Sequence, residues 1–159
     1  MAAVNYFLVV QGIEGESTSA QFEGTIEIES FSWGATQSAS TGTGGGGGAG
    51  KVSLSDFSVL KRVDKASPQL FLACATGRHI PRALLMARRN SPNVVFLQYE
   101  LSDVLVSSFK DVGTEGEYPL EEVTFTYAKI EFKYVPILPT GQPGSPITVA
   151  YDAQRQTAG

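Results

Sequence analysis

Apolar and polar residues alternate with a period close to two along most of the chain, which predicts β-strands. Segment 4–11 is apolar on both faces and is followed by the turn-forming string GIEGE, as expected for a covered strand. Segment 94–107 has an apolar row on one face and a polar row on the other. The apolar row is Val95, Leu97, Tyr99, Leu101 and Leu105, and the polar row is Gln98, Glu100 and Ser102.

The alternation slips by one residue at three places, near residue 29 and within segments 54–57 and 127–130. Such slips are typical of β-bulges and of long strands that bend around a corner. We therefore expect a mainly β fold, a β-barrel of two packed sheets, in a single domain over residues 1–159.

One helix interrupts the strands, at the string ASPQLFLACATG. Ser67 is a favourable N-cap, Pro68 suits the first turn, and Gly77 can adopt the left-handed conformation that ends a helix. The apolar stripe of this helix is Leu70, Phe71, Ala73 and Cys74. A helix this short is marginal alone, so we expect it to flank the barrel with Leu70, Phe71 and Cys74 buried.

Glycine and proline mark the segments between strands. Residues 36–51 contain seven glycines and predict an extended loop, residues 136–146 contain four prolines, and residues 153–159 are expected to be a flexible tail. A glycine-rich segment cannot form its own core, but it can reach a neighbouring copy. The residues of this hypothetical assembly loop are Gly44, Gly45, Gly46, Gly47, Gly48 and Lys51.

The same loop has the spacing of a phosphate-binding loop, with Gly45, Gly50 and Lys51. A phosphate-binding loop needs Ser or Thr after the lysine and then a helix, but Val52 follows and begins an alternating segment. Nucleotide binding is therefore not favoured.

Charge and cysteine content exclude several classes of protein. The net charge of −4 does not suit a protein that binds nucleic acid along its whole surface. The single cysteine, Cys74, cannot form an intrachain disulfide or a multi-thiolate metal site. The first apolar run has no Lys or Arg before it and ends by Gln11, so we expect neither a cleaved signal peptide nor a membrane span.

Catalytic groups are sparse. Cys74 and His79 could form a thiolate–imidazole pair, but a thiol in an apolar stripe and a histidine after a helix end have simpler structural explanations. Glu14, Glu16 and Glu23 match no metal-ligand spacing. We therefore expect no catalytic, cofactor-binding or metal-binding residues, and the protein is not expected to be an enzyme.

Basic and acidic residues form two groups that could meet between copies of the chain. The basic group is Arg78, Arg82, Arg88 and Arg89, and the acidic group is Glu115, Glu117, Glu121 and Glu122. We expect the arginines to face the glutamates of a neighbouring copy.

Several strings together resemble one family, the haemolysin-coregulated protein (Hcp) family of type VI secretion systems. They are GEST at 15–18, SFSWG at 30–34, the long string GGGGGAGKVSLSDFSVLKRVDKASPQLFLACATGRHIPRALL at 44–85, LSDVLVSSF at 101–109 and EVTFTYAKIEFKYVP at 122–136. The resemblance spans about residues 4–152. It implies a homohexameric ring, stacking of rings into a hollow exported tube, a spike protein and a sheath as partners, and small effector proteins in the lumen.

The resemblance therefore predicts a structural tube protein that is made in the bacterial cytoplasm and secreted through the type VI apparatus. Two alternatives stay open: a tail-tube subunit of a phage-like contractile particle, and a small hydrolase that uses Cys74 and His79. Phe31 and Trp33 should enter the core, so alternation turns Ser32 to the other face, where we place a cargo contact. Tyr151 and Asp152 match the aromatic–acidic pair with which family members end.

Overall fold

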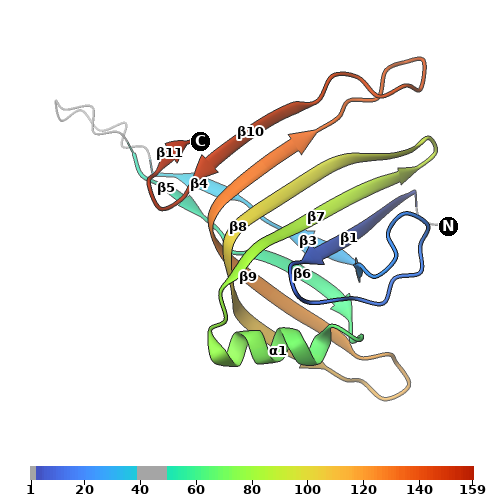
Figure 1. Cartoon of the computed structure of the whole chain (residues 1–159), viewed down its shortest axis with the longest axis vertical. Coiled ribbons are helices and arrows are strands. Elements are labelled where there is room, and N and C mark those ends of the chain that lie inside the picture. Colours follow the sequence, from blue (N-terminus) through green and yellow to red (C-terminus); the bar gives the residue numbers. More distant parts are fainter. Residues whose placement is uncertain (1–2, 39–49) are drawn as a thin grey trace.

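The computed structural model describes residues 3–38 and 50–159, and most of them lie in β-strands (Figure 1). The strands are β1 (Val4–Val10), β2 (Ile26–Ile28), β3 (Ser30–Ser32), β4 (Ala35–Gln37), β5 (Val52–Leu54), β6 (Phe57–Arg62), β7 (Ile80–Asn90), β8 (Asn93–Val112), β9 (Leu120–Tyr134), β10 (Ile147–Asp152) and β11 (Thr157–Ala158). The described residues contain one helix, α1 (Ser67–Thr76). The prediction of a mainly β fold with one short flanking helix is confirmed.

Nine strands form one antiparallel sheet, in which β11, β10, β9, β8, β7, β1 and β2 follow one another. The strand β9 pairs along one edge with β8, and its other edge is shared by β6 and β10. The strand β3 extends the sheet beyond β6. The sheet curls around a single core, but no ladder among the described strands closes the barrel.

The alternation slip near residue 29 marks a change of partner strand. Ile26 and Ile28 are buried on β2, which pairs with β1, whereas β3 pairs with β6. Between them, the Glu29 N–H donates to the carbonyl of Leu60 at 2.8 Å. One continuous segment thus links the two edges of the curled sheet, and the bulge expected there is a crossing between partner strands.

The long strand β8 departs from strict alternation. Val104 and Val106 are buried, and Leu105 is 40% exposed, so the prediction that Leu105 belongs to the apolar row was wrong. The reason is the backbone at Asp103, whose φ of 53° lies in the left-handed region and changes which face the following residues occupy. A register shift against β9 follows between Val106 and Ser108.

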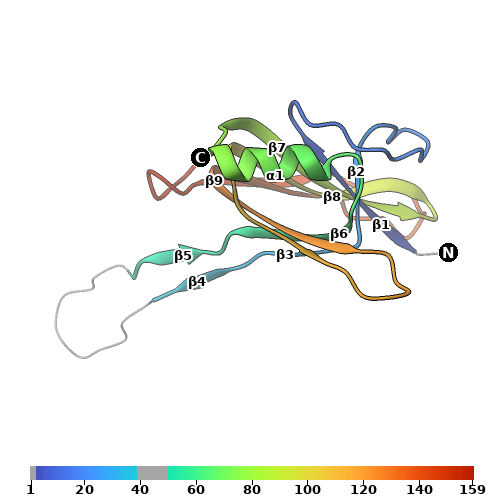
Figure 2. The ribbon, with the colours of Figure 1, turned by 90° about the horizontal axis from the view of Figure 1, so that it is seen from below.

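A second, two-stranded sheet joins β4 and β5 into a ribbon that projects from one end of the molecule (Figure 2). Part of the predicted loop is therefore strand, because Thr36 and Gln37 pair with β5. Beyond them, the Ser38 N–H donates to the Lys51 carbonyl at 3.2 Å. The predicted contacts of Gly44–Gly48 lie outside the described residues.

The ends of helix α1 agree only in part with the expected caps. Gly77 has φ 65° and ends the helix in the left-handed conformation, and Pro68 lies in the first turn. The N-cap is Ala66, not Ser67, and no side chain caps this end. The prediction for Ser67 was wrong because its side chain is buried and bonds to charged groups of the sheet.

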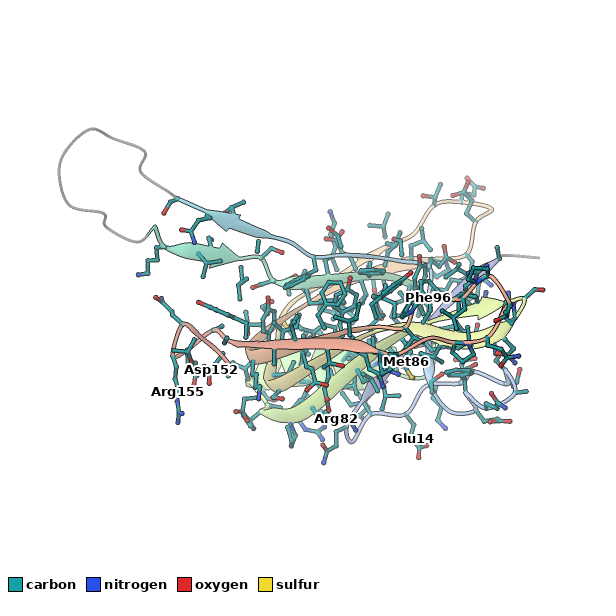
Figure 3. All side chains as sticks on the ribbon, turned by 90° about the horizontal axis from the view of Figure 1, so that it is seen from above. Glu14, Arg82, Met86, Phe96, Asp152 and Arg155 are labelled. Carbon is teal, nitrogen blue, oxygen red and sulfur yellow. The ribbon has the colours of Figure 1, made fainter. Side chains whose placement is uncertain are left out.

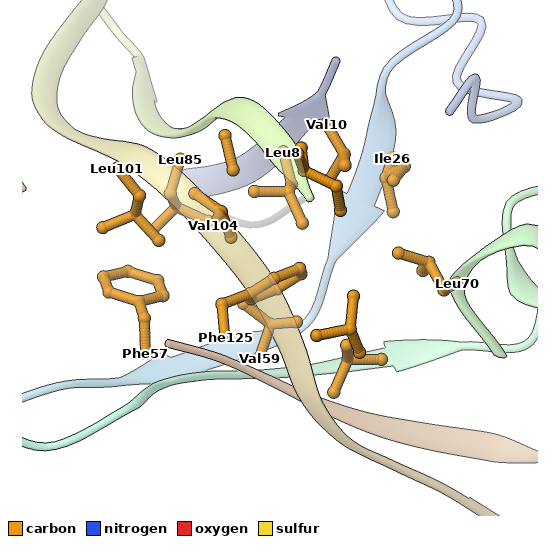
Figure 4. Close-up of a cluster of buried hydrophobic side chains, with 14 of the residues drawn as sticks. Leu8, Val10, Ile26, Phe57, Val59, Leu70, Leu85, Leu101, Val104 and Phe125 are labelled. Carbon is orange, nitrogen blue, oxygen red and sulfur yellow. The ribbon is translucent and has the colours of Figure 1, made fainter. Parts of the chain in front are cut away.

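Figure 4 shows part of the core, a cluster of buried side chains that includes Leu70 of α1 and residues of β1, β2, β6, β7, β8 and β9. Leu70 and Ala73 are at most 1% exposed, whereas Cys74 is half-buried. Phe71 is 55% exposed, so the prediction that it is buried was wrong. The helix docks through the narrow stripe of Ala66, Leu70 and Ala73, and Phe71 contacts Phe109 on its flank, with ring centroids 5.8 Å apart.

The last residues turn back onto the sheet. Thr157 pairs with Asp152 and Ala158 with Tyr151, so the segment expected to be a flexible tail includes the short strand β11. Figure 3 shows Asp152 and Arg155 at the end of the molecule from which the ribbon projects. Within the described part of the chain, no helix has the length and apolar character to cross a membrane.

Candidate functional site

Ser32 lies on β3 with its side chain exposed, and its neighbours in the chain turn the other way. Phe31 packs in the core against Phe57, with centroids 5.7 Å apart. Trp33 donates its indole N–H to the hydroxyl of Tyr127 at 2.6 Å. Burial raises the pKa of Tyr127 above 10.0, so this hydroxyl stays neutral at physiological pH. The aromatic contacts on one face fix Ser32 on the other.

Register pairing extends Ser32 into a row of hydroxyl groups across four strands. Ser32 on β3 lies opposite Ser58 on β6, Ser58 lies opposite Thr124 on β9, and Thr124 lies opposite Ser108 on β8. The Thr124 and Ser108 hydroxyls are 2.6 Å apart. We call these four residues the hydroxyl row. It forms a small, polar and uncharged band on the solvent face of the sheet.

The sequence analysis identified Ser32 but missed the other three members. Ser58 lies between the buried Phe57 and Val59, so alternation alone turns it outward. The same argument applies to Thr124, between Val123 and Phe125. What the sequence lacked was the strand order, because β3, β6, β9 and β8 are neighbours only in the folded sheet.

A buried ion pair lies beneath the start of α1. The Lys61 ammonium is 2.6 Å from Glu121 Oε2 and 2.8 Å from Asp64 Oδ1. Ser67 donates its hydroxyl to Glu121 Oε2 at 2.9 Å. Burial raises the pKa of Glu121 above 4.5, and the neighbouring Asp111 adds to the rise, while Lys61 opposes it. Through these contacts, Ser67 connects the start of α1 to the ion pair between β6 and β9.

Two of the four arginines of the basic group interact within the chain. Arg82 forms an ion pair with Glu100 on the adjacent strand, and Arg88 lies 5.1 Å from the centroids of two aromatic rings. Glu121 is buried with Lys61, so the prediction that Glu121 faces arginines of another copy was wrong. For the other acidic residues this pairing stays a prediction.

The suggested pair of Cys74 and His79 is not formed. His79 Nε2 lies 3.2 Å from Asp103 Oδ1, and both side chains are more than 60% exposed. Cys74 is half-buried beside the core. In the part of the chain that the structure describes, no three His, Cys, Asp or Glu side chains are grouped to hold a metal ion. Glu14 instead lies 3.5 Å from the ammonium of Lys65.

The fold is a curled antiparallel sheet with one flanking helix and a projecting ribbon, and solved proteins of type VI secretion share it. A structure described as a type six secretion system protein superposes with a TM-score of 0.93 at 27% identity, covering 99% of this chain and 100% of that one. The crystal structure of Hcp1 from Salmonella typhimurium gives a TM-score of 0.83 at 29% identity and covers 99% of both chains.

The sequence comparisons agree with the fold. Residues 7–134 match the family described as type VI secretion system effector, Hcp. Protein hcp1 of Pseudomonas aeruginosa is 37% identical over 157 residues, which cover 96% of this chain and 97% of that protein. The chain belongs to the Hcp family.

Proposed function

We propose that this protein is the tube subunit of a type VI secretion system, which forms homohexameric rings that stack into a hollow tube. Membership of the Hcp family supports the tube. The hydroxyl row is the observation from which we assign the inner wall of the tube. It places four small neutral side chains side by side on a solvent face, over the aromatic side of the core.

A wall of this kind suits transport. Large apolar groups would hold cargo and make free rings adhere to one another, and a single-sign charged wall would select cargo by charge. Hydroxyl groups form weak, exchangeable hydrogen bonds with water or with a protein surface. We therefore assign small effector proteins as cargo and Ser32 as their first contact.

The remaining partners belong to the same proposal. A spike protein at the tip and a contractile sheath around the tube would drive export from the bacterial cytoplasm through the type VI apparatus. The protein acts by assembly and has no enzymatic activity or cofactor. The exposed pair of His79 and Asp103 and the half-buried Cys74 support this reading, because no activated nucleophile is present among them.

Ring formation is tested by native mass spectrometry and negative-stain imaging of the purified protein. We expect a mass of six subunits and rings with a central hole. A monomer at micromolar concentration, with no ring in the images, would contradict the proposed function.

The lumen assignment is tested by Ser32→Gln, which adds bulk without charge. We expect intact hexamers and reduced co-purification of at least one small effector. Ser32→Ala is the matched control and should retain cargo better than Ser32→Gln. Rings that dissociate in Ser32→Gln would place this residue at a subunit contact, and unchanged cargo retention would remove it from the lumen.

The assembly-loop hypothesis is tested by deleting Gly44–Gly48. We expect weaker assembly with an unchanged melting temperature of the barrel, because glycine has no side chain to bury. Rings and stacks of unchanged size in imaging and size-exclusion chromatography would reduce this segment to a connector.

A further inference from the structure

One pocket of the molecule has more acidic than basic groups. It has a volume of about 340 Å³ and lies where β1, β2 and the end of β6 meet the segment between β1 and β2. Glu16, Glu27, Glu29 and Asp64 supply four carboxylates, and Asp64 shares the Lys61 ammonium with Glu121. We call the pocket bounded by Glu16, Glu27 and Glu29 the acidic pocket.

These three glutamates have no cationic partner among the described side chains. Glu16 accepts the backbone N–H of Lys65 at 2.6 Å, and Glu27 accepts the Ser17 hydroxyl at 3.1 Å. The Glu29 side chain is exposed and forms no ion pair within residues 3–38 and 50–159. The pocket therefore retains acceptors for an added cation.

Two arginines line the same pocket, but each is held by aromatic rings. The Arg62 guanidinium lies 3.9 Å above the Tyr118 ring. Arg88 lies 5.1 Å from the centroids of both Phe7 and Phe22. Neither guanidinium forms an ion pair with a pocket carboxylate in the described structure. The two guanidiniums offset part of the negative charge, but the four carboxylates of the lining outnumber them.

The projecting ribbon presents the complementary charge. Between Glu29 and Asp56, Lys51 is the sole charged residue of the sequence. Its backbone is paired with Ser38 at the outer end of the ribbon, with the Lys51 N–H 3.2 Å from the Ser38 hydroxyl. The side chain is exposed and forms no ion pair among the described residues.

The lysine and the acidic pocket belong to opposite ends of the molecule. Figure 2 shows β3 and β4 following one line from the region of β2 to the projecting ribbon. At about 3.3 Å per strand residue, the segment from Glu29 to Ser38 spans on the order of 25–30 Å. Lys51 therefore cannot reach the pocket of its own chain.

We propose that the Lys51 ammonium of one copy binds in the acidic pocket of a second copy, between the carboxylates of Glu27 and Glu29. Because the two surfaces differ and lie at opposite ends, the contact is heterologous and leaves a free lysine and a free pocket for further copies. A heterologous contact either closes into a ring or continues without end, and between rings that are already formed it supports head-to-tail stacking. This inference concerns contacts between rings, so it deepens the proposed function and rests on the ring formation proposed there.

One exposed ion pair contributes little, and salt screens it. In a ring, identical contacts form together, so their small contributions multiply into a large change in the association constant. Stacking should accordingly weaken more steeply with salt than ring formation does.

The experiment is a charge swap. Lys51→Glu and Glu29→Lys should each lower the association constant between rings at least tenfold in sedimentation velocity at low salt, while the rings persist. The double variant should restore stacking, because the swapped charges attract again. Lys51→Arg and Glu14→Lys are matched controls and should stack like the wild type. Failure of the double variant to recover would overturn the proposal.

A cross-link tests the contact where stacks are short-lived. In a Cys74→Ser background, Lys51→Cys combined with Glu29→Cys should give, with diamide as oxidant, a ladder of disulfide-linked multimers, and each single-cysteine variant should stop at dimers. Absence of the ladder, or dimers alone in the double variant, would overturn the contact. Absence of hexamers in the wild type would instead count against the proposed function.

Discussion

The strands β6 and β9 face the core with three successive rows of side chains, and the third row differs in kind from the first two. The rows are Phe57 with Phe125, Val59 with Val123, and Lys61 with Glu121. All six side chains are at most 1% exposed. The same pair of strands, on the same face and at the same depth, therefore contains two apolar rows and one ion pair.

The difference lies in what each row depends on. Apolar side chains stabilise the fold by leaving water, and this gain needs no particular partner and does not change with pH. Buried charges lose their hydration, and the pair repays this loss only while both partners and their hydrogen bonds are present. The free energy of unfolding should therefore fall far more when one member of the ion pair is removed than when both are removed.

The largest effect is expected for Lys61→Met, which fills similar volume but leaves the Glu121 carboxylate without its cation. Breaking a buried pair in this way costs about 3–5 kcal/mol at neutral pH. Urea unfolding at fixed protein concentration would measure it as a lower midpoint with an unchanged slope.

The control is the double variant Lys61→Met with Glu121→Leu, which makes the third row apolar like its neighbours. We expect a stability close to that of the wild type, because neither member of the desolvated pair remains, while Asp64 loses its cation and keeps the Ala66 backbone N–H. A double variant as unstable as Lys61→Met would show that the rows do not differ in the way described.

A smaller loss is expected in the second row. Val59→Ala removes two methyl groups from a fully buried position and should cost about 1.5–3 kcal/mol. The loss should be the same at pH 5 and pH 8, since no titratable group is touched. A loss that changed by more than about 1 kcal/mol between these pH values would indicate that the apolar and charged rows are coupled.

The third row should also make stability depend on pH. Burial raises the folded-state pKa of Glu121 above 4.5, so the folded protein binds this proton more readily than the unfolded chain does. The contribution of this proton to the free energy of unfolding is fully present below the unfolded-state pKa of Glu121 and is lost as the pH rises through the folded-state pKa. The loss is at most about 1.4 kcal/mol per pH unit. The difference in unfolding free energy between wild type and Glu121→Gln should follow this course. A difference that grew with rising pH would contradict it.

The apolar rows follow the alternating pattern of the sequence, whereas the charged row could not be predicted from it, for a physical reason. Val59 and Phe125 fall on the inward phase of an alternating pattern, and Lys61 and Glu121 continue that phase. Their charge argued for solvent, because an isolated buried charge is too costly to expect. Only the register of β6 against β9 brings the two charges together, and register is a property of the folded sheet.

Helix α1 shows a second feature that the sequence could not predict. Periodicity correctly placed Leu70 in the core, but it could not tell how wide the buried stripe is. Small Ala66 and Ala73 let the helix dock along a narrow line, and Phe71 is left on its flank. The family resemblance, in contrast, depended on long strings of residues and needed no geometry.

The smallest effect is expected at Phe71, which belongs to none of the three rows. Phe71→Ser removes an exposed ring whose contact with Phe109 is edge-to-face, and such a contact contributes about 0.5–1.5 kcal/mol. We therefore expect a loss near 1 kcal/mol, against several for the neighbouring Leu70→Ser, which places a hydroxyl in the core. Thermal unfolding of the two variants side by side would measure this difference. Equal losses would mean that Phe71 is covered in the assembled protein. The two variants measured before and after ring dissociation would then locate the covering surface on a neighbouring copy.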